Sequence, residues 1–132
     1  MRHRRKGRHL NRPADQRKAL LRSLMGALLR HERIKTTDAR AKELRRHIEK
    51  LITVARRGVE SEEPGQRLHA WRRCVARLPD PPAVTKLFAM LAPQDEDEPP
   101  RFRERPGGYT RVTPLYRRVG DRARIVQIEF VE

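Results

Sequence analysis

The chain has 132 residues, of which 36% are hydrophobic and 5% aromatic, so it can form one small domain with a modest core. Its 32 lysines and arginines outnumber 17 aspartates and glutamates and give a formal charge of +15, which opposes compactness unless a polyanion such as nucleic acid neutralises it. We expect no membrane partner, because no apolar run reaches membrane-spanning length and no signal-peptide pattern is present, and the single cysteine excludes an intramolecular disulfide.

The charge is unevenly distributed along the chain. Counted as Lys and Arg minus Asp and Glu, residues 1–57 carry +14, residues 58–100 carry −3 and residues 101–132 carry +4. We therefore expect the binding surface in the first half, with a smaller contribution from the C-terminal segment.

The first twelve residues, MRHRRKGRHLNR, form a basic arm without an acidic residue. Arginine predominates there, and its guanidinium group binds phosphates in a bidentate manner and stacks on bases. We predict that residues 1–12 bind RNA or DNA through Arg2, His3, Arg4, Arg5, Lys6, Arg8 and Arg12. A solvated tail is the alternative. An organelle-import signal is disfavoured, because the arm has no serine and no amphipathic apolar face.

Residues 10–32 have the pattern of an amphipathic helix. Asn11 is expected to be its N-cap, and Pro13 suits the first turn. Leucines and a methionine share one side at helical spacing: Leu20, Leu21, Leu24, Met25 and Leu28. The other side extends the basic surface with Arg17, Lys18, Arg22 and Arg30. Gly26 on that side allows close approach either of a phosphate backbone or of another protein segment.

Residues 33–37 predict a short strand, after which Thr37 is expected to cap a helix that Gly58 ends. Apolar residues in this helix recur at i, i+3, i+7, i+10, i+11 and i+14, from Ala41 to Ala55. Its outer face is basic and is assigned to RNA binding through Lys42 and Arg46, beside Arg45 and Lys50. The alternative for Arg46 is a local ion pair with Glu49.

The rest of the chain predicts two shorter helices and two strands. Leu68, Trp71, Val75 and Leu78 mark a third helix, and Asp80 starts a fourth. An acidic, proline-rich loop at 94–100 precedes strands within 105–116 and 122–131, which are joined near Gly120 and Asp121.

Tyr109 and Arg111 follow a glycine pair at the start of the first of these strands. A tyrosine beside an arginine can stack on an exposed base, so both are assigned to RNA binding. A core position for Tyr109 is an equally good interpretation.

Together these elements predict an α+β fold with about four helices, a small two- or three-stranded mixed sheet and an extended basic N-terminal arm. The sheet is expected to pack on the first two helices, because they have the widest apolar faces. Residues 13–132 are expected to form a single domain.

The sequence offers no candidate catalytic site. The five histidines show no metal-ligand spacing with each other or with Cys74, and no phosphate-binding glycine loop, nucleophile elbow or paired-carboxylate motif is present. We therefore expect no enzyme activity, cofactor, metal or small-molecule substrate, and we expect Cys74 near the core.

Several segments in order resemble the bacterial-type large-subunit ribosomal protein seventeen family. They are residues 1–22, residues 28–53, KLFAMLAP at 86–93, RFRERPGGYTR at 101–111 and the closing residues 120–132. Residues 59–84 and the acidic loop are less typical of the family.

The resemblance implies a structural component of the large ribosomal subunit that binds its long ribosomal RNA. Its expected position is near the exit of the nascent-peptide tunnel, beside other ribosomal proteins, and its arm is expected to lie within RNA. The resemblance adds Asn11, Lys35, Thr36 and Thr37 to the expected RNA-binding residues. The expected location is a ribosome in the bacterial cytoplasm or inside a mitochondrion or plastid.

A small nucleoid or DNA-architectural protein that uses the arm in a minor groove is the alternative function. Such a protein would bind duplex DNA about as well as RNA.

Changing Arg4, Arg5 and Arg8 to alanine is expected to weaken RNA binding and to flatten its salt dependence. Each lost phosphate contact removes about 0.7–0.9 from the slope of log K against log salt concentration. Binding titrations over a salt series measure this slope. An unchanged slope would mean that the arm is only a tail.

Overall fold

The computed structural model describes residues 3, 6–92 and 99–131, and within them it has the predicted α+β architecture. The elements, in chain order, are α1 (Ala14–His31), β1 (Arg33–Thr37), α2 (Asp38–Glu60), α3 (Gln66–Arg77), α4 (Pro81–Leu91), β2 (Thr110–Arg117) and β3 (Arg124–Phe130). Most of the acidic loop predicted at 94–100 lies outside the described residues.

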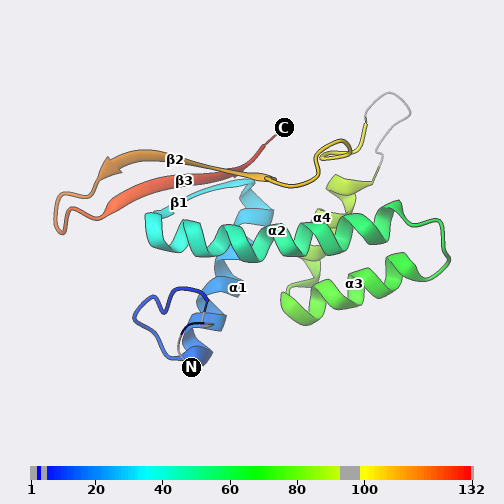
Figure 1. Ribbon diagram of the computed structural model, residues 1–132, viewed down its shortest axis with the longest axis horizontal. Coiled ribbons are helices and arrows are strands. Elements are labelled where there is room, and N and C mark those ends of the chain that lie inside the picture. Colours follow the sequence, from blue (N-terminus) through cyan, green and yellow to red (C-terminus); the bar gives the residue numbers. More distant parts are fainter. Residues whose placement is uncertain (1–2, 4–5, 93–98, 132) are drawn as a thin grey trace.

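Helix α2 is the centre of the fold. It contacts each of the six other elements, with the sheet along one of its sides and α3 along another (Figure 1). The periodic residues predicted as its core face are all 0–1% exposed: Ala41, Leu44, Ile48, Leu51, Ile52 and Ala55. The apolar stripe of α2 spans four turns, so it is long enough to pack against both the sheet and the other helices.

The sheet has the order β1-β3-β2 and is antiparallel throughout, so the prediction of a mixed sheet is wrong. β2 and β3 are joined by a short turn, which forces them to run in opposite directions. β1 pairs antiparallel on the other side of β3, with Arg33 opposite Glu129. The sheet lies along α2, which contacts all three strands, whereas α1 meets β1. Its contact face includes Val126 and Ile128, both 0% exposed.

The predicted start of α1 is wrong. The helix begins at Ala14, with Pro13 rather than Asn11 in the N-cap position and no side-chain cap hydrogen bond. Leu10 and Asn11 have φ values of 54° and 50°, so the chain turns in the left-handed region before the helix begins. Asparagine tolerates this conformation better than most residues, which explains its presence in the turn.

The predicted end of α2 at Gly58 is also wrong, because the helix continues to Glu60. Gly58 is buried where α3 crosses closest, and a Cβ atom added to it would lie 2.2 Å from the Cβ of Ala70. The glycine is therefore required by close helix packing and does not act as a C-cap.

Gly26 is likewise explained by packing within the protein. A Cβ atom at this position would lie 2.9 Å from Oδ2 of Asp80, which also forms an ion pair with Arg30. Asp80 caps α4 as predicted, since its side chain accepts a hydrogen bond from the backbone N–H of Ala83 at 3.3 Å. Of the two alternatives for Gly26, close approach of another protein segment is the one observed.

Cys74 lies in the core between α3 and α2, as predicted. Its thiol is fully buried and lies 3.9 Å from the backbone oxygen of Leu51. Burial raises the pKa of the Cys74 thiol to about 11, since the thiolate cannot be solvated there. Among the described residues, no helix is both long and apolar enough to cross a membrane.

Gly58→Ala is expected to lower the free energy of unfolding. Overpacking costs about 1–3 kcal/mol, and the short Cβ–Cβ approach places this case at the upper end. Alanine regains roughly 1 kcal/mol through helix propensity, so we expect a net loss of about 2 kcal/mol in urea unfolding.

Two variants control this experiment. Adding Ala70→Gly should restore part of the stability, because it removes the second Cβ atom of the clash. Gly107→Ala should be nearly neutral, since nothing lies within 4 Å of a Cβ atom there. A Gly58→Ala protein as stable as the parent would contradict the packing account.

Candidate nucleic-acid interface

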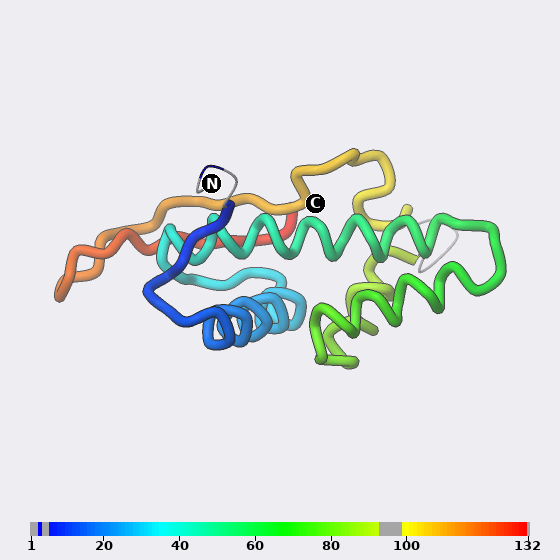
Figure 2. The backbone as a smooth tube through the Cα atoms, turned by 60° about the horizontal axis from the view of Figure 1, so that its bottom comes forward, coloured from blue at the N-terminus to red at the C-terminus, as the bar shows by residue number. Residues whose placement is uncertain are grey.

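The described part of the arm folds back from α1 across the first half of α2 (Figure 2). The backbone N–H of Arg8 donates a hydrogen bond to Oε2 of Glu43 at 3.2 Å. On the α1 side, Nη1 of Arg17 donates to the backbone oxygen of Arg12 at 3.1 Å and lies 3.3 Å from Nδ1 of His9. The arm is thus held in two places, by α2 at Arg8 and by α1 at His9 and Arg12.

Gly7 fits the arm closely over α2. Its φ of +106° lies in a region that other residues rarely adopt, and an added Cβ atom would lie 3.2 Å from Oε1 of Glu43. Glu43 is only 5% exposed, and it also pairs with Arg46 at 3.7 Å and with His47 at 3.4 Å. This buried carboxylate therefore positions the arm.

A cleft of about 670 Å³ lies between the arm, α1, α2 and the end of α3. Among the described residues that line it, Glu43 is the only acid, and its carboxylate pairs with Arg46 and lies 3.4 Å from His47. Apolar side chains of Leu21, Met25 and Leu51 contribute to its wall. The basic residues that line it are Lys6, Arg8, Arg17, Lys18, Arg22, Lys50 and Arg77.

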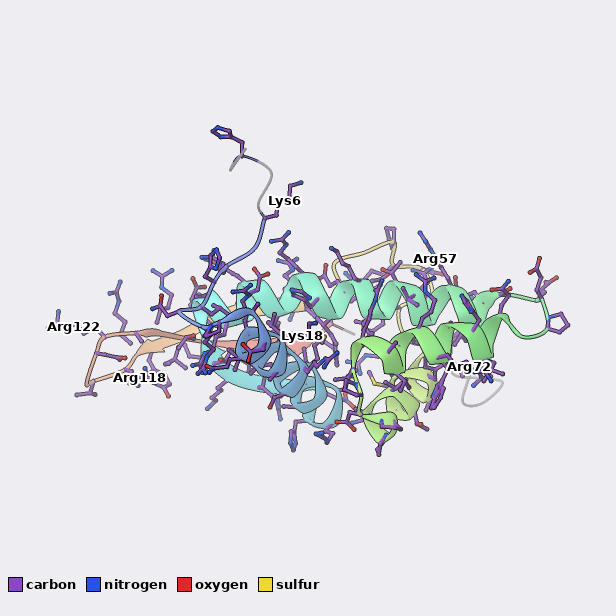
Figure 3. All side chains as sticks on the ribbon, turned by 90° about the horizontal axis from the view of Figure 1, so that it is seen from below. Lys6, Lys18, Arg57, Arg72, Arg118 and Arg122 are labelled. Atoms are coloured by element: carbon purple, nitrogen blue, oxygen red, sulfur yellow. The ribbon has the colours of Figure 1, made fainter. Side chains whose placement is uncertain are left out.

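Several of these cations are available to a ligand. Lys6, Lys18 and Lys50 are exposed and make no hydrogen bond or ion pair with the part of the chain that the structure describes. Figure 3 shows Lys6 on the projecting arm and Lys18 on the body of the protein. Arg22 donates from Nε to the backbone oxygen of Arg77 at 3.2 Å, and so joins α1 to the end of α3. The cleft is therefore a preformed basic surface that suits a phosphate backbone.

Other predicted RNA-binding residues lie outside the cleft. Arg30 pairs with Asp80, and Lys42 pairs with Asp38 at 2.7 Å, although both basic side chains are half exposed. Lys35 is exposed on β1.

The local ion pair with Glu49, given above as the alternative for Arg46, is not the one observed, because Nη1 of Arg46 lies 3.7 Å from Oε2 of Glu43. Glu49 pairs instead with Arg45 at 3.2 Å and accepts a hydrogen bond from Oγ1 of Thr110 at 2.9 Å. Glu49 thereby connects α2 to the start of β2.

Tyr109 belongs to the core. Its side chain is 2% exposed, and its ring centroid lies 5.1 Å from that of Phe102. Nη1 of Arg56 donates to its hydroxyl group at 3.3 Å. Tyr109 therefore offers no face to a base, and of its two interpretations the core position is the one observed.

The remaining predicted residues are spread along the surface. Arg111 is exposed on β2, 3.9 Å from Glu129, while Thr36 and Thr37 are half-buried at the end of β1. Arg12 is half-buried and Asn11 and His3 are exposed within the arm. Arg2, Arg4 and Arg5 lie outside the described residues.

The sequence analysis missed some residues that the fold brings to the basic surface. His47 and Arg77 line the cleft, and Arg77 comes there from α3, whose sequence gives no sign of this proximity. Arg117, Arg118, Arg122 and Arg124 lie on the exposed β2–β3 hairpin. These four arginines cluster around the turn predicted near Gly120 and Asp121, and this clustering was the sequence signal that could have identified them. Within the described residues, no group of three His, Cys, Asp or Glu side chains could hold a metal ion.

Comparison with known proteins shows which family the chain is similar to. The family model described as Ribosomal protein L17 matches residues 20–131. The chain is 44% identical over 132 residues to the large ribosomal subunit protein bL17 of Syntrophotalea carbinolica, covering all of this chain and 76% of that protein. It is also 44% identical to the protein of the same name from Trichlorobacter lovleyi, covering 100% and 94% of the two chains. The bL17 protein of Caldanaerobacter subterraneus is 47% identical over 124 residues, or 94% and 97% of the two chains. The two alignments over 132 residues include the arm, which lies outside the match to the family model.

Glu43→Gln is expected to loosen the arm, because a neutral amide accepts a weaker hydrogen bond than a carboxylate. We expect hydrogen exchange at the Arg8 amide to become roughly tenfold faster, equivalent to about 1.4 kcal/mol. Glu62→Gln, at an exposed position between α2 and α3, should leave this rate unchanged. Unaltered protection of the Arg8 amide in Glu43→Gln would show that Glu43 does not hold the arm.

Proposed function

Because the chain belongs to the ribosomal protein L17 family, we propose that it is a structural constituent of the large ribosomal subunit and acts by binding large-subunit ribosomal RNA. The observation that carries the RNA-binding proposal is the basic cleft beneath the arm. Lysines and arginines from the arm, α1, α2 and α3 meet there around one acid, Glu43, which is paired with Arg46.

In the proposed mechanism, the arm enters between RNA helices while the cleft grips a phosphate backbone. Neutralisation of phosphates by these cations releases counterions, which supplies affinity. The rigid core fixes the spacing of the cations, so RNA shape provides most of the specificity. This agrees with the narrow major groove of RNA helices, whose base edges side chains cannot read.

We further propose a position near the exit of the nascent-peptide tunnel, next to other large-subunit proteins, where the chain supports subunit assembly and translation. This proposed position is the one that the resemblance to the family implies. The bacterial origin of the relatives favours a ribosome in the bacterial cytoplasm over one inside an organelle. The role is structural, and catalysis is no part of it.

Lys18→Ala combined with Lys50→Ala is expected to weaken binding to large-subunit RNA and to lower the salt slope by roughly 1.4–1.8, the value for two phosphate contacts. Filter binding over a potassium chloride series measures both quantities. The matched control is Arg67→Ala with Arg72→Ala, which removes the same charge from exposed positions on α3.

Equal effects of the two double variants would mean that only net charge matters and that the cleft is not the binding site. Competition with duplex DNA tests the alternative of a nucleoid protein. Displacement of the RNA by DNA at equal concentration would favour that alternative.

A further inference from the structure

The tip of the β2–β3 hairpin projects from the body of the protein (Figures 1 and 2). The tube trace and the ribbon both show it extending beyond the start of α2 (Figures 1 and 2). All residues from 113 to 122 are exposed, so this end of the hairpin lies outside the core of the described protein. Because residues 113–122 lie outside the core, their side chains are accessible to a binding partner.

A β-bulge interrupts the pairing of β2 with β3 at the base of the projecting part. Pro114 lies opposite Val126 and Tyr116 lies opposite Ile125, so Leu115 is the additional residue. Bulges bend and twist a strand, and Pro114 is tolerated because β2 is an edge strand.

The tip of the hairpin is ordered by its own contacts. Arg118 donates from Nε and Nη2 to the carboxylate of Asp121 at 2.9 and 2.6 Å. The backbone N–H of Arg118 donates to the oxygen of Ala123, and that of Arg122 donates to the oxygen of Arg118, both at 2.9 Å. The hydrogen bonds from Arg118 hold the pKa of Asp121 well below its usual range. The one acid of the tip therefore serves the turn and leaves the other arginines unopposed.

The remaining side chains of the tip include three arginines and a tyrosine, which are residue types that bind RNA. Arg117, Arg122 and Arg124 are exposed and make no ion pair or side-chain hydrogen bond with described residues. Tyr116 is 57% exposed and Val119 is 98% exposed. Residues 101–132 contain eight arginines and no lysine. Arginine binds phosphate in a bidentate manner and stacks on bases, and an exposed tyrosine offers a second stacking surface.

We propose that residues 114–124, here called the hairpin finger, form a second RNA contact that binds unpaired or irregular large-subunit RNA. This inference rests on the proposed function but concerns a surface separate from the cleft. Tyr116 stacks on an unpaired base, while Arg117, Arg122 and Arg124 bind the flanking phosphates. In Figure 3, Arg118 and Arg122 lie at one end of the molecule and Lys6 projects from its long side, so arm and finger reach different RNA segments.

The direct test is hydroxyl-radical probing from an iron chelate tethered to a single cysteine. Val119→Cys places the chelate at the tip of the finger, His3→Cys places it on the arm, and Arg72→Cys places it on α3. The native Cys74 is fully buried, so it does not compete for the reagent. Each full-length protein is assembled into large subunits before cleavage.

We expect Val119→Cys to cut the ribosomal RNA at sites different from those of His3→Cys, and to cut more strongly than Arg72→Cys. Cleavage from His3→Cys with none from Val119→Cys overturns the finger and leaves the proposed function intact. This is also the result expected if the finger faces a neighbouring protein. Failure of all three proteins to enter the subunit overturns the proposed function and the finger with it.

Variants then test the energetic role of the finger. Replacement of Arg117, Arg122 and Arg124 by alanine should lower the salt slope of RNA binding by roughly 2 or more. The matched control, alanine at Arg67, Arg72 and Arg73 of α3, should not. Tyr116→Ala should weaken binding roughly fivefold or more through lost stacking, whereas Tyr116→Phe should bind like the parent. Identical behaviour of the two triple variants overturns the proposal.

Discussion

Burial of one apolar stripe on α2 determines the arrangement of every other element. The stripe from Ala41 to Ala55 is completely covered, by the sheet on one side and by the other helices elsewhere. Since the chain is short and strongly basic, the apolar contacts made by this helix help to oppose charge repulsion. The tightest point is Gly58 against Ala70, which sets how closely α3 can approach. That approach in turn brings Arg77, at the end of α3, to the cleft beside Arg22.

The polar edge of the same helix organises the candidate RNA surface. Glu43 is buried and is the one acid among the described residues that line the cleft, where it lies among basic and apolar side chains. It accepts the hydrogen bond that holds the arm at Arg8. A negative charge at this point offsets repulsion between the arm and the basic faces of α1 and α2. The arm is consequently presented in a defined direction, which lowers the conformational entropy lost when RNA binds. At the far end of the sheet, Asp121 plays a comparable local role for Arg118.

The sequence predicted the features that depend on local pattern. The stripe of α2 was clear because its period is sustained over four turns, and the β2–β3 pair was clear because Val126, Ile128 and Phe130 alternate with polar residues. Features that depend on tertiary contact were not predictable. Gly58 resembled a C-cap, although what requires the glycine is Ala70 of α3, which lies 12 residues further along the chain. Tyr109 could not be assigned without the ring of Phe102 beside it, and Arg77 could not be assigned without its hydrogen bond to Arg22 across 55 positions.

The most direct test of the central claim is sedimentation of the tagged protein from its own cells, on gradients that separate the ribosomal subunits, before and after a high-salt wash. An integral constituent held by an inserted arm and a preformed basic cleft should remain with the large subunit in stoichiometric amount after the wash. Loss of the protein at moderate salt, or its migration with DNA or as free protein, would contradict this account.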